Sequence, residues 1–380
     1  MNALPVARLF GFEIRVHVSW AIILALIAVS VVTQAGMLAP DASPATSWLI
    51  GGVIAAGFLL SALAHELGHA VAARRAGLPG VPVVIYVFGG AAGPDLETER
   101  PRDEATIALA GPLVSLAIGL LFVGVFLVTL VAGGAADGAA TTIGRIAVVI
   151  GALNLLLGLV NLLPAYPLDG GRVVRAVIWQ RTGDASEGLR AAATSGRWLG
   201  RLAAVVGFAV VLTLDAIDGL FIAAFGWFLI TVAKAAERST AVDDLLVGSV
   251  VDDVMVHDTS GVPAGLTLDT FAEQLLSAEA PGAVPVLRDQ EFIGMLGARQ
   301  VARIRRDRWP TTRASDVLVA GDSMPSVSPS TPLRAVLDLL QQHALDGLPV
   351  RVDGAFTGIV TRRAVAALVR ERARERGVVP

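Results

Sequence analysis

The chain contains no cysteine among its 380 residues. Disulfide bonds are therefore excluded, and any metal site must use histidine and carboxylate ligands. Charged residues are scarce, at 17%, and the net charge of −3 gives no reason to expect a nucleic acid partner. Apolar residues are abundant instead, at 54%, with a mean hydropathy of +0.67. This composition predicts a membrane protein.

The apolar residues are concentrated in the N-terminal part of the chain. We expect an α-helical polytopic membrane domain over residues 1–239, followed by a soluble tail. A helix needs about 20 apolar residues to cross the hydrocarbon core, and six stretches meet or nearly meet that length. They are Val18–Ala35, Trp48–Ala73, Ala105–Val131, Ile143–Leu163, Arg197–Leu214 and Leu220–Ala236. The first is expected to be retained, because no clean signal-cleavage site follows it.

The connections between these stretches alternate in charge. Gly36–Ser47, Ala132–Thr142 and Asp215–Gly219 contain no lysine or arginine, whereas the other connections contain many arginines. Because positive residues are retained on the cytoplasmic side, both termini and the tail are expected in the cytoplasm of a multi-pass cell-membrane protein. An even number of spans agrees with this orientation.

Two segments of the membrane half are not simple spans. Val81–Ala92 is rich in β-branched and aromatic residues but too short to cross, which indicates a hairpin or a short re-entrant β element. Leu163–Gly171 contains two prolines and two glycines, so it cannot be helical throughout. Such backbone is tolerated at membrane depth only against protein or a water-filled cavity.

One apolar stretch contains the sequence His65-Glu66-Leu67-Gly68-His69. In a helix, His65 and His69 lie on the same face and can bind one ion, while Glu66 lies beside it and can take a proton from water. Ionisable groups inside an apolar span are costly unless they serve an ion, a cavity or a partner. The alternative is a pair of buried, hydrogen-bonded histidines with a glutamate counter-charge.

A zinc site needs a third protein ligand and leaves a fourth position for water. His17 stands at the start of the first stretch, where an interfacial histidine is the simpler interpretation. Asp169 lies on the same side of the membrane as His65 and His69. Spacing alone leaves two roles open for Asp169: zinc ligand, or N-cap of a helix over Gly170–Trp179.

Taken together, these motifs resemble the site-2 protease family of intramembrane zinc metalloproteases. His65–His69 is similar to the family's zinc-binding helix, and Asn161–Arg172 is similar to its second signature, in which the aspartate is the third ligand. Phe88-Gly89-Gly90 and Ala110-Gly111-Pro112 are similar to the flanking blocks. The resemblance implies Zn²⁺ held by His65, His69 and Asp169, with Glu66 as general base.

The resemblance also implies how a substrate is held and cut. Asn161 would help to position or stabilise the reacting carbonyl, although a buried asparagine can also tie off broken helix backbone. Independently of the resemblance, the β-rich composition of Val83–Phe88 suggests that this segment could pair with an extended substrate strand, the alternative being a packing loop. The substrate would be a membrane-anchored protein, such as an anti-sigma factor, cut by regulated intramembrane proteolysis.

The tail is an internal repeat with an offset of 64 residues. Pro285-Val286 recurs as Pro349-Val350, and Phe292 and Gly294 recur as Phe356 and Gly358. Each unit predicts a short strand, a helix, two strands and a second helix. The repeat resembles a soluble α/β pair of CBS modules, expected at 247–312 and 313–375.

CBS pairs often bind adenosine nucleotides, but the ribose-binding pattern is incomplete in this tail. That pattern ends in a serine or threonine followed three residues later by an aspartate. The second repeat has Thr361 followed by Ala364, and the first has Gly297 followed by Gln300. Without the carboxylate, nucleotide binding is in doubt, and a regulatory, dimerising or partner-binding role is at least as well supported.

Two further functions compete with the protease interpretation. A CBS-gated ion transporter would also place ionisable residues in the membrane. The complete signature around Asp169 and the placement of Glu66 argue against it. A non-catalytic membrane scaffold is the third interpretation, and the intact set of ligands and base disfavours it.

Overall fold

The computed structural model describes residues 3–9, 11–17, 24–25, 27–30, 32, 43–78, 83–85, 98–133, 139–214, 216–257, 261–275 and 282–377. The chain forms two compact units, Met1–Thr240 and Ala241–Pro380. Each unit has its own buried apolar clusters.

The N-terminal unit is built mainly from long apolar helices. Five are long and apolar enough to cross a membrane: α3 (Pro44–Arg75), α4 (Pro101–Gly133), α5 (Ala139–Asn161), α7 (Ala185–Thr213) and α8 (Ala216–Leu246). They confirm five of the six expected stretches as helices. The first stretch, Val18–Ala35, lies mostly outside the described residues, although Ile27 is helical and packs against the α3–α5 core.

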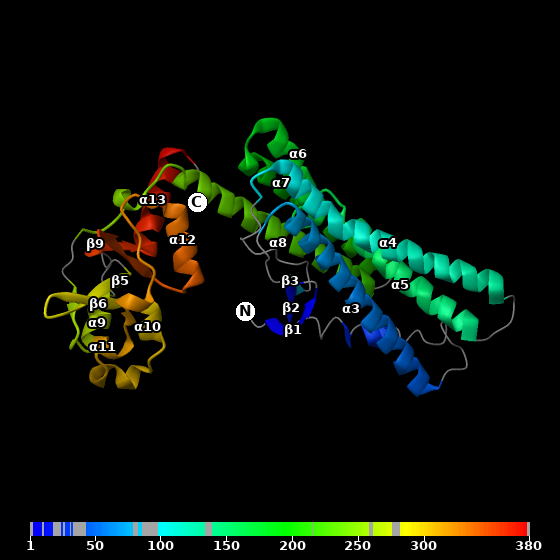
Figure 1. Cartoon of the computed structure of the whole chain (residues 1–380), viewed down its shortest axis with the longest axis horizontal. Helices are drawn as coiled ribbons and strands as arrows, with labels where there is room; N and C mark the ends of the chain where they lie inside the picture. The colour runs from blue at the N-terminus through cyan, green and yellow to red at the C-terminus, as the bar shows by residue number, and fades with distance from the viewer. Residues whose placement is uncertain are drawn as a thin grey trace. The chain divides into compact units, whose positions relative to one another are not determined.

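Helices α3, α4 and α5 lie side by side (Figure 1). Ile50 and Ile54 of α3 and Ile150 of α5 form a buried cluster between them. A Cβ atom at Gly68 would lie 3.0 Å from the Ala110 carbonyl oxygen, so the glycine allows α3 and α4 to pack closely where the histidines are. The long helices leave many large apolar side chains exposed on their outer faces, as expected of surfaces that meet lipid.

A small three-stranded sheet is formed by segments that come before and after α3 in the chain. Strands β1 (Ala3–Leu9) and β2 (Phe12–His17) pair antiparallel, and β3 (Val83–Ile85) pairs parallel to β2. The β element expected within Val81–Ala92 is thus a strand at Val83–Ile85, and the rest of that range lies outside the described residues. The sequence patterns did not predict β1 and β2. The Arg74 guanidinium stacks over the Phe12 ring, 4.6 Å from its centre, and ties the end of α3 to β2.

The proline-rich segment between α5 and α6 (Asp169–Thr182) is not helical, as predicted. It folds back closely onto the first turn of α6. A Cβ atom at Gly170 would lie 2.3 Å from the Leu163 carbonyl oxygen, and one at Gly171 would lie 2.5 Å from the Tyr166 nitrogen. Only glycine fits at these two positions. Helix α6 packs against both α4 and α7.

The C-terminal unit contains the helices and strands of the predicted repeat. Its helices are η2 (Val251–Asp253), α9 (Leu268–Leu275), α10 (Ala298–Ala302), η3 (Arg306–Thr311), α11 (Ala314–Val317), η4 (Gly321–Ser323), α12 (Leu333–Gln342) and α13 (Arg362–Glu375). Its strands are β4 (Val262–Pro263), β5 (Ala283–Arg288), β6 (Glu291–Gly297), β7 (Val319–Ala320), β8 (Gly347–Val352) and β9 (Ala355–Thr361).

The offset of 64 residues reappears in the fold as two equivalent hairpins, β5–β6 and β8–β9. Both have a register irregularity at the same place, after Val286 in the first and after Val350 in the second. The equivalent residues Phe292 and Phe356 stack face to face, with ring centres 4.3 Å apart and planes 10° from parallel.

The two repeats exchange strands. In the first sheet, β7 pairs with β6 although it follows the first repeat in the chain. In the second, Val256 belongs to the first repeat yet bridges to Ile359 of β9. Val251 and Met255 accordingly lie in the core of the second repeat, with Leu348 and Val360. Each sheet is therefore completed by a segment from outside its own repeat.

Candidate metal centre

Helix α3 presents two histidines one turn apart. The Nε2 atoms of His65 and His69 lie 3.2 Å from each other, and their ring planes are 77° apart. This arrangement follows from the helix itself, because residues four positions apart share a face. His65 is buried and His69 half-buried. Both lie on a helix long and apolar enough to span a membrane.

Asp169, distant in sequence, joins the two histidines. Its Oδ2 atom lies 3.3 Å from Nε2 of His65 and 3.3 Å from Nε2 of His69. Asp169 is the first residue of α6, and the N-cap position belongs to Leu168, which makes no side-chain capping bond. Of the two roles that the spacing left open, the carboxylate therefore has the geometry of a ligand, since it faces the imidazoles.

The other nitrogen of each imidazole is held by α4. Nδ1 of His69 lies 2.7 Å from the backbone carbonyl oxygen of Ile107, and Nδ1 of His65 lies 2.9 Å from the hydroxyl of Ser115. A carbonyl only accepts hydrogen bonds, so Nδ1 of His69 must donate and the neutral ring keeps a lone pair on Nε2. A lone pair facing a carboxylate oxygen requires a cation between them, a proton or a metal ion.

Gly111 of α4 provides the space for this group. A Cβ atom there would lie 2.3 Å from Nε2 of His69 and 2.7 Å from Nε2 of His65. Every other residue type would place a carbon atom against the coordinating nitrogens. The metal centre therefore requires glycine at position 111, in addition to any need of helix packing.

Comparisons with known proteins identify the family. The model of peptidase family M50 matches residues 53–132 and 127–197, and the CBS domain model matches residues 314–371. A Mycobacterium tuberculosis protein that bears the name zinc metalloprotease Rip3 is 34% identical over 370 residues, which cover 97% of this chain and 93% of that relative. The chain belongs to peptidase family M50. This is the site-2 protease family, and its members are zinc metalloproteases.

Two other similar proteins are also named as metalloproteases or site-2 proteases. A Synechocystis protein named zinc metalloprotease sll0528 is 29% identical over 96% of this chain and 94% of that protein. The solved site-2 protease from Methanocaldococcus jannaschii is 22% identical, covers 62% of this chain and 95% of its own, and superimposes with a TM-score of 0.42. The family decides between the protease and the alternative of an ion transporter in favour of the protease.

Zinc fits the donor set of this M50 peptidase. Ligand bonds of about 2.0–2.1 Å at tetrahedral angles place neighbouring ligand atoms about 3.3 Å apart. The three facing atoms of His65, His69 and Asp169 are separated by 3.2, 3.3 and 3.3 Å. Two imidazoles and one carboxylate are also a donor combination that catalytic zinc sites use. The side chains are thus already spaced for one zinc ion.

Glu66 and Asn161, the two residues expected to act on the substrate, lie on different helices. Glu66 follows His65 on α3 and is half-buried. Asn161 is the last residue of α5, and its side-chain amide donates to the Leu157 carbonyl one turn back. The catalytic role of Asn161 stays a prediction.

Sequence reasoning missed the contribution of α4 to the site. It singled out Gly111 only as part of a flanking block and named neither Ile107 nor Ser115. A signal for Ser115 existed, since it is a lone hydroxyl inside an apolar run and lies one turn after Gly111. No signal could have revealed Ile107, which acts through its backbone carbonyl.

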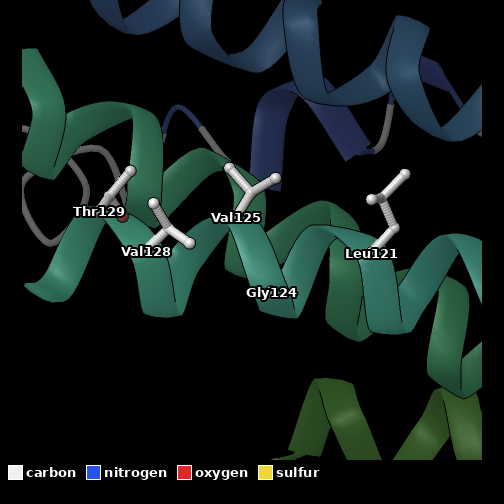
Figure 2. Close-up of a pocket in the computed structure, with 5 residues that line it drawn as sticks. All are labelled: Leu121, Gly124, Val125, Val128 and Thr129. Atoms are coloured by element: carbon white, nitrogen blue, oxygen red, sulfur yellow. The ribbon is translucent and has the colours of Figure 1, made fainter.

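A shallow apolar depression of about 420 Å³ lies elsewhere on α4 (Figure 2). It is lined by Leu121, Gly124, Val125, Val128 and Thr129. At 1.5 Å per residue, Leu121 is about 15 Å along the helix from Gly111. The depression contains no titratable group, so it belongs to the outer apolar surface and not to the metal centre.

Proposed function

We propose that this M50 peptidase hydrolyses peptide bonds within or near the membrane-spanning segment of anchored protein substrates, in regulated intramembrane proteolysis. The observation behind this proposal is the convergence of His65, His69 and Asp169 to within 4.8 Å of one another. Two of the three residues lie on a helix fit to span a membrane. An ion held there would act at membrane depth, where soluble proteases cannot reach.

Each residue of the site has a defined task in this proposal. His65, His69 and Asp169 hold zinc, which when bound supplies a Lewis acid that polarises a carbonyl and acidifies water. Glu66 takes the proton of the attacking water and passes it to the leaving amine. Ser115 and the Ile107 carbonyl keep the imidazole rings in place. Asn161 would assist the reacting carbonyl only after its amide leaves the Leu157 oxygen.

The substrate backbone must be extended at the cut, since a helical peptide hides its scissile bond. Strand β3 supports a way to hold it. The sheet order β1–β2–β3 places β3 at an edge of the sheet within the described residues. An edge strand can pair with an extended segment through main-chain hydrogen bonds. We propose that Val83–Phe88, which begins with this strand, binds substrate in this way.

The decisive experiment compares Glu66→Gln with wild type, using purified full-length protein in detergent and a single-span membrane protein as substrate. Cleavage should fall by several orders of magnitude in the variant while the zinc content stays at one ion per chain, because glutamine keeps the shape but cannot accept the proton. Asp169→Ala should lose the zinc itself. Full cleavage by Glu66→Gln, or wild-type protein without zinc, would overturn the proposal.

We also propose that the tail is a regulatory or dimerisation module made of two CBS modules, 247–312 and 313–375. Helix α8 supports this proposal, because it continues without a break to Leu246, past the start of the second unit. Within that unit, Arg372 donates to the carbonyl of Leu245, and Arg334 forms an ion pair with Asp243. The last residues of α8 thus belong to the tail unit and are held within it by these two contacts.

A further inference from the structure

Glu104 is a buried carboxylate that the reaction does not use. It lies in the first turn of α4, where the helix dipole favours a negative charge, and its exposure is only 2%. Its Oε1 atom lies 3.0 Å from Nη1 of Arg175 and 3.9 Å from Nε of Arg172. Burying a carboxylate is costly unless a partner neutralises it, so the ion pair fixes where these side chains lie.

Both arginines belong to α6, the helix that begins with Asp169. Arg172 and Arg175 follow the aspartate by three and six residues, so Glu104 holds α6 within its first two turns. Helix α6 also packs closely against α7, since a Cβ atom at Gly188 would lie 2.4 Å from the Arg175 carbonyl oxygen. Rotation of α6 about its axis would break the ion pair and move the Asp169 carboxylate away from the histidines.

Glu104 also shares a face of α4 with the residues that support the histidines. Glu104, Ile107, Gly111 and Ser115 follow one another at spacings of three and four, which align them along one stripe of a helix. Helix α4 supplies no ligand of its own. Through this stripe it contacts both histidines directly and the helix that begins with Asp169 by an ion pair.

We propose that Glu104 is a positioning residue of the metal centre, which holds Asp169 within reach of His65 and His69 through its ion pairs with α6. The inference rests on the proposed function, because it takes these three residues as the zinc ligands. Glu104 itself touches neither the metal nor the substrate. Its effect is on the distance between one ligand and the other two.

The test measures zinc affinity of the full-length protein by competition with a chelating dye. Glu104→Gln keeps the side-chain size but removes the charge, and it should weaken zinc binding about 10- to 100-fold, the usual effect of losing a group that orients a ligand. Arg175→Met removes the α6 partner of the same ion pair and should lower zinc affinity by a similar factor. The double variant should lose little more than either single variant, since the two residues act as one pair.

Glu237→Gln is the matched control. It removes the ion pair between Arg197 of α7 and Glu237 of α8, which does not involve α4 or α6. Zinc affinity should be unchanged in this variant. If Glu237→Gln weakens zinc binding as much as Glu104→Gln does, the effect is general destabilisation and the inference is wrong.

Cobalt in place of zinc adds a readout of ligand geometry. The visible absorption of bound Co²⁺ should change in Glu104→Gln and stay as in wild type in Glu237→Gln. If both Glu104→Gln and Arg175→Met have wild-type zinc affinity and an unchanged spectrum, the inference is wrong, but the proposed function still stands. Failure of wild type to bind zinc, or of Asp169→Ala to lose it, would instead overturn the proposed function.

Discussion

The side chains of His65 and Ser115 meet in the interior of the membrane unit, with Nδ1 of the histidine 2.9 Å from the serine hydroxyl. Ser115 is completely buried and His65 is 4% exposed. The contact therefore helps to set the orientation of the ring whose other nitrogen faces Asp169.

Removing this hydroxyl should weaken the metal centre without unfolding the protein. We expect Ser115→Ala to lower zinc affinity about 10- to 100-fold, because the His65 ring loses its orienting partner. Dye competition on the purified protein measures the effect. Ser195→Ala is the control, since the Ser195 hydroxyl donates only to the Ala192 carbonyl of its own helix. Equal zinc affinity in Ser115→Ala and wild type would contradict the prediction.

A methyl group at Gly111 should abolish the site. In Gly111→Ala the new carbon would lie 2.3 Å from Nε2 of His69, where it blocks both the nitrogen and the ion. We expect almost complete loss of zinc and no cleavage, measured by metal analysis and by proteolysis of a membrane-anchored substrate. Gly124→Ala lies on the same helix with no atom within 4 Å of the added carbon, and should behave as wild type. Zinc-loaded Gly111→Ala protein would disprove the assignment.

The absence of cysteine allows a direct test of orientation, because a single introduced cysteine is the only thiol in the chain. Ala45 stands in the first turn of α3, within the connection Gly36–Ser47 that has no lysine or arginine, and Ser326 lies in the tail; both are exposed. In intact cells a membrane-impermeant maleimide should label Ala45→Cys and leave Ser326→Cys unlabelled until lysis, as the positive-inside rule requires. The reverse labelling pattern would place the tail outside.

Adenosine nucleotides should bind the tail weakly or not at all. The hydroxyl of Thr361, the candidate ribose contact, is completely buried and accepts a hydrogen bond from the Ala364 nitrogen at the start of α13. No aspartate follows at the position where the CBS pattern requires one. Calorimetry of the full-length protein with ATP, ADP and AMP should give no measurable heat, whereas Ala364→Asp should gain affinity. Micromolar binding to wild type would show that another group holds the ribose.

Much of the fold could be predicted because its signals are local. Runs of apolar residues gave five membrane-length helices, and a helical spacing of four placed His65 beside His69. Sequence similarity at a fixed offset gave the repeat of the tail. Strands β1 and β2 were missed; they form a hairpin with each other, and β2 also pairs with Val83–Ile85, more than sixty residues away.

The sequence by itself determined that the chain is a membrane protein with two histidines and a glutamate on one helix, because composition and helical periodicity depend only on neighbouring residues. Only the tertiary structure brings Asp169 to the two histidines. Its spacing suits a helix cap as well as a ligand, and the approach of α6 to α3 brought its carboxylate to the imidazoles. The same holds for Ile107, whose contribution is a backbone carbonyl that every residue possesses. Such contacts arise from packing between helices far apart in the chain, and no local pattern encodes them.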